Sequence, residues 1–327
     1  MSFIDFDINN VFKINSSSEF NDISLKIFRF QVENNSVYKH YLQLLNVNPK
    51  EVTNVHDIPF LPIDFFKTHQ VLCGDEHEKI FLSSGTTQQV RSKHYVKNSS
   101  LYEQSFTKGF ELFYGKPNDY CILALLPNYL EQGDSSLVYM MQHLIAQSND
   151  AQSGFFLNEF DKISDIIQQK NQEEKKCFLI GVTYALLDFA EQCATPLHNT
   201  IVIETGGMKG RRKELIREEL HSILKGKLGV SSIHSEYGMT ELLSQAYSKG
   251  DGKFTTPPWM KVLTRSIYDP FSYTQEKSGA LNIIDLANVY SCSFIATQDI
   301  GKLNNDGTFE VLGRVDNADV RGCNLMI

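Results

Sequence analysis

The sequence lacks a long hydrophobic run, a paired-cysteine motif and an excess of positive charge. No apolar run approaches the roughly 20 residues that span a bilayer, and the first ten residues, MSFIDFDINN, have neither the basic nor the apolar region of a signal peptide. The formal net charge of −8 has the wrong sign for sequence-independent binding to nucleic acid. These absences predict a cytoplasmic protein with no membrane span and no nucleic-acid partner.

The cysteines are few and scattered. Six occur in 327 residues, and no two of them form a CxxC pair. Several lie in apolar runs such as DYCILALLP and KKCFLIGV, where a thiol behaves as a small core residue. A disulfide framework and a zinc site are therefore not expected, and a reducing compartment suits the chain. The six are Cys73, Cys121, Cys177, Cys193, Cys292 and Cys323.

The chain does contain a regular alternation of short apolar runs with longer amphipathic ones. Residues 1–60 have apolar positions near helical spacing and end at the proline-marked DIPFLPIDFF. The patterns after that predict strands at 121–126, 177–182, 200–204 and 232–234, with helices around 101–114, 135–147, 161–170, 184–193 and 209–225. Such alternation indicates βαβ units and a largely parallel sheet covered on both faces.

The pattern changes from about residue 255. The short apolar segments ALNIIDL, SCSFIAT and TFEVLGRV are separated by turns such as Asn305-Asp306-Gly307. Short strands joined in this way are typical of an antiparallel sheet. The fold class is therefore α/β first and β-rich at the end.

The segment IFLSSGTTQQVRSKHYV contains the first candidate site. Residues 80–82 read as the end of a buried strand, and the five residues SSGTT that follow cannot pack a core. Glycine frees the backbone, so N–H groups and hydroxyls can converge on phosphate oxygens, and Arg91, Lys93 and His94 place positive charge just beyond. An ordinary Ser/Thr turn is the alternative. There is no GK[ST], so this is not a Walker loop.

Two further segments follow predicted strands. ETGGMKGRRKE places Gly206 and Gly207 directly after the strand that ends near Glu204, where glycines permit close approach of a ligand, although a structural turn explains them as well. In HSEYGMTELLSQAY, Tyr237 offers an aromatic face for a base. Thr240 offers a hydroxyl for phosphate, and Glu241 offers a carboxylate for Mg²⁺. Both lie where the chain is expected to turn into a helix, so the alternative is that they only cap the start of that helix.

The last two segments lie in the β-rich part. In FIATQDIGKL a strand is expected to end at Asp299, whose carboxylate could accept hydrogen bonds from both ribose hydroxyls. The alternative is that Asp299 is a simple turn residue. VLGRVDNADVRGCNLMI carries Gly313, Arg314 and Asp316 after the last long strand, and the guanidinium can reach ribose or phosphate.

In sequence and order, SSGTT, GG, YGMTE, a strand-ending Asp and GRxD resemble the core motifs of the adenylate-forming acyl-CoA synthetase and luciferase superfamily. The likeness runs from Ser83 to the C-terminus. More narrowly, FLPIDFFKTH, PNYLEQGDSSLVYMM, ETGGMKGRRKE and RGCNL resemble the acyl-protein synthetase (LuxE-type) branch, to which phenylacetate–CoA ligases are related.

The resemblance implies a role for each motif. The loop would close over the ATP phosphates, and Tyr237 with Gly238 would contact the adenine. Thr240 would contact the α-phosphate, and Glu241 would bind Mg²⁺. Asp299 and Arg314 would contact the ribose. The loop residues are Ser83, Ser84, Gly85, Thr86 and Thr87, and Gly206 and Gly207 would lie along the nucleotide.

The same resemblance implies a core domain over residues 1–312, helical at 1–60, α/β at 61–254 and β-rich at 255–312, followed by a short hinge-like tail at 313–327. Two departures stand out. The family loop usually continues GTTG-x-PK, whereas Gln88, Gln89 and Val90 follow here. Full-length members also continue past the hinge, here Asp316, into a mobile domain with a catalytic lysine, and this sequence ends 11 residues after it.

The expected function is ATP-dependent activation of a carboxylic acid, fatty or aryl, with transfer to a thiol. Alternatives are an acyl-CoA ligase that uses a partner chain and a non-catalytic nucleotide- or acyl-binding homologue. A protein partner is expected to be a reductase, a transferase or an acyl carrier. The resemblance makes Cys323 a candidate acyl acceptor, although the segment could dock as a final strand. Lys209–Lys213 is expected to be a solvated helix start without a catalytic lysine.

Overall fold

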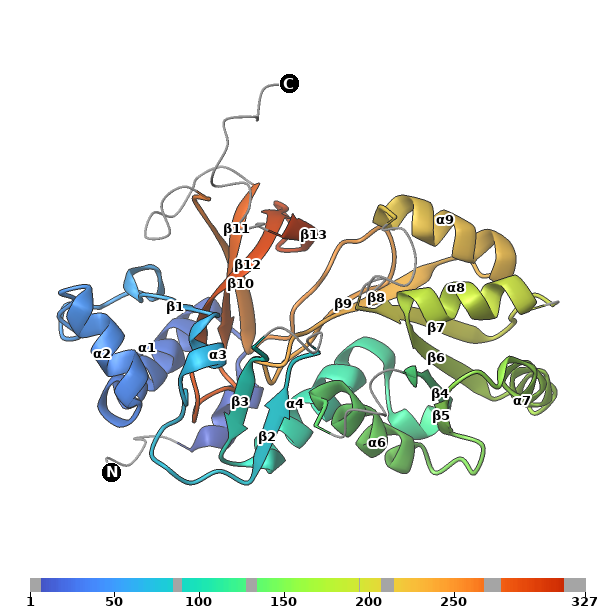
Figure 1. Cartoon of the computed structure of the whole chain (residues 1–327), viewed down its shortest axis with the longest axis horizontal. Coiled ribbons are helices and arrows are strands. Elements are labelled where there is room, and N and C mark those ends of the chain that lie inside the picture. The colour runs from blue at the N-terminus through green and yellow to red at the C-terminus, as the bar shows by residue number, and fades with distance from the viewer. Residues whose placement is uncertain are drawn as a thin grey trace, which may run out of the picture.

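The computed structural model describes residues 7–84, 90–127, 134–193, 195–206, 215–267 and 278–314. It contains a six-stranded sheet, a five-stranded sheet and a two-stranded hairpin. Figure 1 shows the two larger sheets side by side, with the hairpin β2–β3 below and between them. Within the described ranges, no helix is both long and apolar enough to cross a membrane.

The N-terminal part is helical, as the sequence predicts. It contains η1 (Ile8–Lys13), α1 (Ser17–Asn34), α2 (Ser36–Leu44), η2 (Val55–Asp57), β1 (Leu61–Pro62) and α3 (Phe65–Thr68). The Ser16 side chain accepts from the Glu19 amide at the start of α1, and Asn35 both ends α1 and caps α2. Buried Gln31 donates to the carbonyls of Asn288 (3.1 Å) and Val289 (2.8 Å), which fixes α1 against the five-stranded sheet.

The six-stranded sheet has the order β5-β4-β6-β7-β8-β9, parallel except for β9. Its strands are β4 (Tyr120–Leu125), β5 (Gly154–Phe156), β6 (Lys176–Val182), β7 (Thr200–Thr205), β8 (Ile233–Tyr237) and β9 (Ala246–Ser248). Every residue of β4 is buried, because helices cover both faces of a parallel sheet.

Helices connect these strands and lie on both faces of the sheet. They are α4 (Ser99–Tyr114), α6 (Ser136–Ser148), α7 (Phe160–Gln172), α8 (Thr183–Gln192) and α9 (Arg217–Leu228), with the short η3 (Pro117–Asp119) before β4. Figure 1 shows α4 and α6 together below the sheet, and α8 and α9 together above it. Arg217 of α9 also donates to the Val311 carbonyl (3.2 Å) and so joins the two larger sheets.

The five-stranded sheet has the order β1-β12-β11-β10, and β13 pairs with the far half of β12. Its long strands β10 (Met260–Arg265), β11 (Ser278–Asp285), β12 (Phe294–Leu303) and β13 (Phe309–Arg314) are antiparallel. The hairpin consists of β2 (Lys79–Leu82) and β3 (Lys93–Val96), paired Phe81 to His94.

The predicted alternation and the antiparallel end are confirmed, with strand ends displaced by at most three residues. Two details were wrong. The helix predicted at 209–225 begins at Arg217 and ends at Leu228, and residues 209–214 lie outside the described ranges. In β2 only Phe81 is buried, so the strand is less buried than its apolar letters indicate.

Candidate functional site

Three side chains from three strands form a hydrogen-bonded chain where the two larger sheets meet. The Tyr237 hydroxyl at the end of β8 donates to Asp299 Oδ2 (2.7 Å), and Arg314 Nε of β13 donates to Asp299 Oδ1 (3.0 Å). Asp299 and Arg314 are opposite each other in the ladder of β12 and β13. The structure thus brings together three candidates that are up to 77 positions apart in the sequence (314 − 237).

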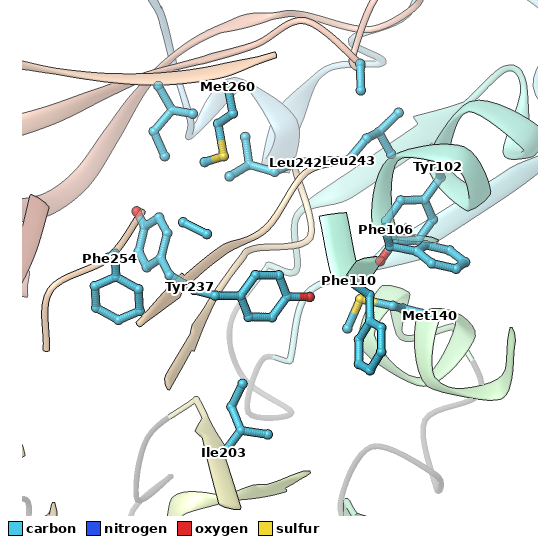
Figure 2. Packing of buried hydrophobic residues seen from close by; sticks show 14 of the residues in the cluster. Tyr102, Phe106, Phe110, Met140, Ile203, Tyr237, Leu242, Leu243, Phe254 and Met260 are labelled. Carbon is cyan, nitrogen blue, oxygen red and sulfur yellow. The ribbon is translucent and has the colours of Figure 1, made fainter. Parts of the chain in front are cut away.

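The three members of this chain differ in burial. Tyr237 and Asp299 are 9% and 5% exposed, whereas the Arg314 side chain is 71% exposed. Burial, and then the adjacent Asp299 charge, raise the pKa of Tyr237 well above its usual value, so the phenol stays protonated and remains a donor. The ring of Tyr237 packs near that of Phe254, with centroids 5.8 Å apart (Figure 2). The centroid of the Phe309 ring lies 5.4 Å from that of Tyr237.

Asp299 is within a strand and not at its end, which corrects the sequence-based expectation. β12 continues to Leu303, and its register with β13 shifts between Ile300 and Gly301. A strand irregularity of this kind changes the direction of the side chains near it. Gly313 and Arg314 lie within β13, which corresponds to the strand predicted from the segment TFEVLGRV.

Thr240 and Glu241 lie in a turn, so the predicted helix start at this position was wrong. All of residues 238–254 are described, and no helix forms among them before or after the short strand β9. Tertiary hydrogen bonds hold the turn instead: Asp285 Oδ2 accepts from the amides of Leu243 (2.7 Å) and Ser244 (3.0 Å). Asp285 is fully buried, and the sequence showed no sign of this role.

The Glu241 carboxyl is 5% exposed. Burial raises its pKa, while a hydrogen bond with the Ser92 side chain, and then the charges of Arg314 and Lys67, oppose that shift. A bound divalent cation would offset the same burial cost. Within the described ranges no group of three or more His, Cys, Asp or Glu residues could hold a metal ion. A single carboxylate such as that of Glu241 fits Mg²⁺, because this ion usually takes one or two protein carboxylates and completes its shell with phosphate and water.

The hairpin β2–β3 presents the start of the predicted phosphate loop. Ser83 N donates to the Ser92 carbonyl (3.0 Å), and Ser92 N donates to Ser83 Oγ (2.9 Å). Ser84 is exposed at the end of this hairpin. The remaining loop candidates, Gly85, Thr86 and Thr87, lie outside the described residues, as do Gly207, Asp316, Cys323 and the basic segment Lys209–Lys213.

Glycine is required at Gly206, which follows β7 with a φ of 70°. Its carbonyl accepts a hydrogen bond from the hydroxyl of Thr183 (2.9 Å), the first residue of α8. A Cβ at Gly238 would lie 2.5 Å from Glu236 Oε1, so a larger residue there would displace that carboxylate. Both glycines lie beside the carboxyl ends of parallel strands, which is where α/β sheets bind ligands.

Sequence reasoning missed Glu236. It precedes Tyr237 in β8 and accepts a hydrogen bond from the Thr205 hydroxyl of β7. Its pKa is raised to about 7, mainly by burial; the hydrogen bond from Thr205 lowers the pKa, and the nearby Glu204 charge raises it. The available signal was an acidic residue directly before Tyr237 in the segment HSEYGMTE.

Comparisons with known proteins identify the family and the fold of the chain. The family model described as acyl-protein synthetase, LuxE, matches residues 11–327. The solved structure of ATP-bound MatB from Rhodopseudomonas palustris is 17% identical, with a TM-score of 0.53 over 74% of this chain and 48% of that chain. The solved structure of 2-hydroxyisobutyryl-CoA ligase in the postadenylation state with 2-HIB-AMP is 10% identical, with a TM-score of 0.64 over 96% of this chain and 74% of that chain. The chain thus spans about half the length of MatB and shares the fold of these ligases. Comparison with curated proteins gave no match.

Proposed function

Since the chain belongs to the acyl-protein synthetase family LuxE, we propose that it activates a carboxylic acid with ATP and passes the acyl group to a thiol. One oxygen of the acid attacks the α-phosphorus, the bond to the bridging oxygen breaks, and pyrophosphate leaves. The acyl-adenylate then transfers its acyl group to sulfur and releases AMP, while the thiol proton goes to solvent. We further propose that the acid is a fatty acid.

The observation that carries the proposal is the chain Tyr237–Asp299–Arg314 beside the buried Glu241 carboxyl. Asp299 accepts hydrogen bonds from Tyr237 and Arg314, and a carboxylate side chain can also accept hydrogen bonds from the hydroxyl groups of a ribose. Arg314 is exposed enough to reach a ligand with the guanidinium nitrogens that do not contact Asp299.

Two parts of the chain would bind the phosphates. Glu241 would hold Mg²⁺, which when bound supplies positive charge to the phosphate oxygens as pyrophosphate leaves. The Thr240 hydroxyl and the serines of the hairpin would orient the phosphates by hydrogen bonds. We propose that Gly85, Thr86, Thr87, Gly206 and Gly207 allow close backbone approach to the nucleotide, and that Tyr237 and Gly238 border the adenine.

Acid-dependent release of pyrophosphate tests this function. The pure protein is incubated with ATP, Mg²⁺ and a panel of fatty and aryl acids. Glu241→Gln should lower the rate on the order of 100-fold, because the metal loses its carboxylate. Glu310→Gln, which removes a carboxylate from a surface pair with Lys302 (3.7 Å), is the matched control and should keep the rate. ATP binding without release for any acid would favour a non-catalytic, nucleotide-binding role instead.

The acceptor thiol is a separate proposal. Among the described cysteines, four are buried and Cys193 is partly exposed. Burial raises the pKa of Cys292 to about 12 and that of Cys73 still further, which makes both thiols inert. We propose that Cys323, beside Arg321, takes the acyl group as a thioester before a partner protein receives it.

Intact-protein mass after incubation with ATP, Mg²⁺ and an accepted acid tests the acceptor. A hydroxylamine-sensitive adduct should appear, should be lost in Cys323→Ser with pyrophosphate release intact, and should persist in the control Cys193→Ser. An adduct retained in Cys323→Ser would refute the assignment. A rate that depends on added CoA, with no adduct, would indicate an acyl-CoA ligase.

A further inference from the structure

His94 of β3 is completely buried and links the hairpin to the turn that carries Thr240 and Glu241. Its Nδ1 lies 2.8 Å from the Thr240 carbonyl oxygen, and its Nε2 lies 3.0 Å from Asn288 Oδ1. The Phe66 ring packs edge-on against the imidazole, at 5.7 Å between centroids. Both ring nitrogens therefore face oxygen acceptors, and the rest of the ring is in an apolar environment.

Asn288 completes the arrangement from the loop between β11 and β12. Its Nδ2 donates to the Glu241 carbonyl (2.9 Å) and to the Cys292 carbonyl (3.0 Å). These two acceptors orient the amide, because only the NH₂ group can face two carbonyls, and its oxygen is left toward His94. The carbonyls of two successive residues, Thr240 and Glu241, are thus held by His94 and Asn288.

The hairpin also reaches the Glu241 side chain. Ser92, two residues before His94, forms the side-chain hydrogen bond with the Glu241 carboxyl, and its amide donates to Ser83 Oγ. One short strand segment therefore contacts the first serine of the SSGTT motif, the Thr240 backbone and the Glu241 carboxyl. A displacement of the hairpin would move all three.

We propose that His94 and Asn288 are positioning residues that hold the Thr240–Glu241 turn in register with the β2–β3 hairpin, so that the metal-binding carboxyl and the phosphate-binding serines face the same Mg·ATP. The inference rests on the proposed function. The two residues act through the turn and do not contact the substrate. Burial lowers the pKa of His94 to about 4, and its contacts with the Thr240 carbonyl and with Asn288 oppose that shift.

The test compares three replacements of His94. Asn can place an amide donor where Nδ1 lies, so His94→Asn should keep the bond to the Thr240 carbonyl, whereas His94→Leu cannot. We expect His94→Leu and Asn288→Ala to lower kcat for pyrophosphate release on the order of 10- to 100-fold and to raise the half-saturating Mg²⁺ concentration, as misplaced catalytic groups do. His94→Asn should stay within about threefold of the unmodified protein. His143→Leu, a partly exposed histidine of α6, is the matched control and should change neither quantity.

The chain's single tryptophan reports whether the turn is folded. Trp259 Nε1 donates to Ser244 Oγ (3.0 Å), four positions after Thr240, so its emission should be retained in every variant that is correctly folded around it. Loss of activity in His94→Leu with unchanged emission, together with recovery in His94→Asn, supports positioning. The inference is refuted if His94→Leu keeps the original kcat and Mg²⁺ dependence, or if His94→Asn is as impaired as His94→Leu.

Failure of the proposed function would be seen differently. The unmodified protein would then release no pyrophosphate with any acid, although it is folded. The positioning role would in that case be measured by calorimetry as the Mg²⁺ dependence of ATP binding. Equal affinities in His94→Leu and the unmodified protein would refute it there as well.

Discussion

Replacing Tyr237 by Phe should destabilise the protein more than replacing Arg314 by Gln, although both residues donate to the same carboxylate. The Tyr237 hydroxyl reaches Asp299 at 2.7 Å in a buried position, and a hydrogen bond to a charged group contributes about 1.5–3 kcal/mol. Phe keeps the ring and its packing against Phe254 and Phe309, so the loss should be that of the bond alone, about 2 kcal/mol.

Arg314 should contribute much less to the free energy of unfolding. Its side chain is 71% exposed, so water and salt screen its contact with Asp299, and exposed ion pairs are worth about 0–1 kcal/mol. Its effect should instead be seen in ligand binding. If the exposed guanidinium contacts ribose or phosphate, Arg314→Gln should raise the KM for ATP several-fold while the midpoint of unfolding barely moves.

Urea unfolding followed by Trp259 emission measures the first quantity, and steady-state pyrophosphate release measures the second. The double variant completes a thermodynamic cycle, in which we expect a coupling of less than about 1 kcal/mol between Tyr237 and Arg314. The reasoning is refuted if Arg314→Gln costs as much stability as Tyr237→Phe, or if Tyr237→Phe costs less than about 0.5 kcal/mol.

Two further predictions concern β8 and β12. The pKa of Glu236 is raised from 4.5 to about 7 in the folded protein. Between these two pH values the folded state binds one more proton than the unfolded state, so the free energy of unfolding falls as pH rises through 7. Glu236→Gln should therefore be more stable than the unmodified protein at pH 8, by at most about 3 kcal/mol, and nearly equal at pH 5 in chemical denaturation; an equal difference at both pH values would contradict this. Gly301→Ala should lower stability by about 1–3 kcal/mol, because its Cβ would lie 2.5 Å from the Glu310 carbonyl oxygen and 2.7 Å from Leu281. Gly226→Ala in α9, with no atom within 4 Å, is its control and should not lower the melting temperature.

The architecture was largely predictable from local patterns. Apolar runs such as CFLIGV become fully buried parts of parallel strands, and the change of pattern near residue 255 corresponds to the antiparallel sheet. A strand that is buried on both faces is uniformly apolar, so its sequence alone is enough to predict a buried strand. The order of the motifs also predicted the family, and the match of the family model to residues 11–327 confirms that prediction.

Local reasoning failed where distant residues replace local hydrogen bonds. The segment after Tyr237 has the sequence pattern of a capped helix. Its backbone groups are instead hydrogen-bonded by the side chains of Asp285 and Asn288, which are more than 40 positions away, and these bonds hold a turn. Asp299 likewise reads as a strand end, but pairing with β13 continues the strand.

The sequence by itself determined which residue types are available for the chemistry and where strands and helices run, because composition and periodicity are properties of neighbouring positions. Only the tertiary structure decided that Tyr237, Asp299 and Arg314 share hydrogen bonds and that His94 holds the Thr240 carbonyl. The physical reason is that these contacts satisfy buried polar groups across different sheets. Which donor meets which acceptor there depends on how the sheets pack, and no short stretch of sequence records that.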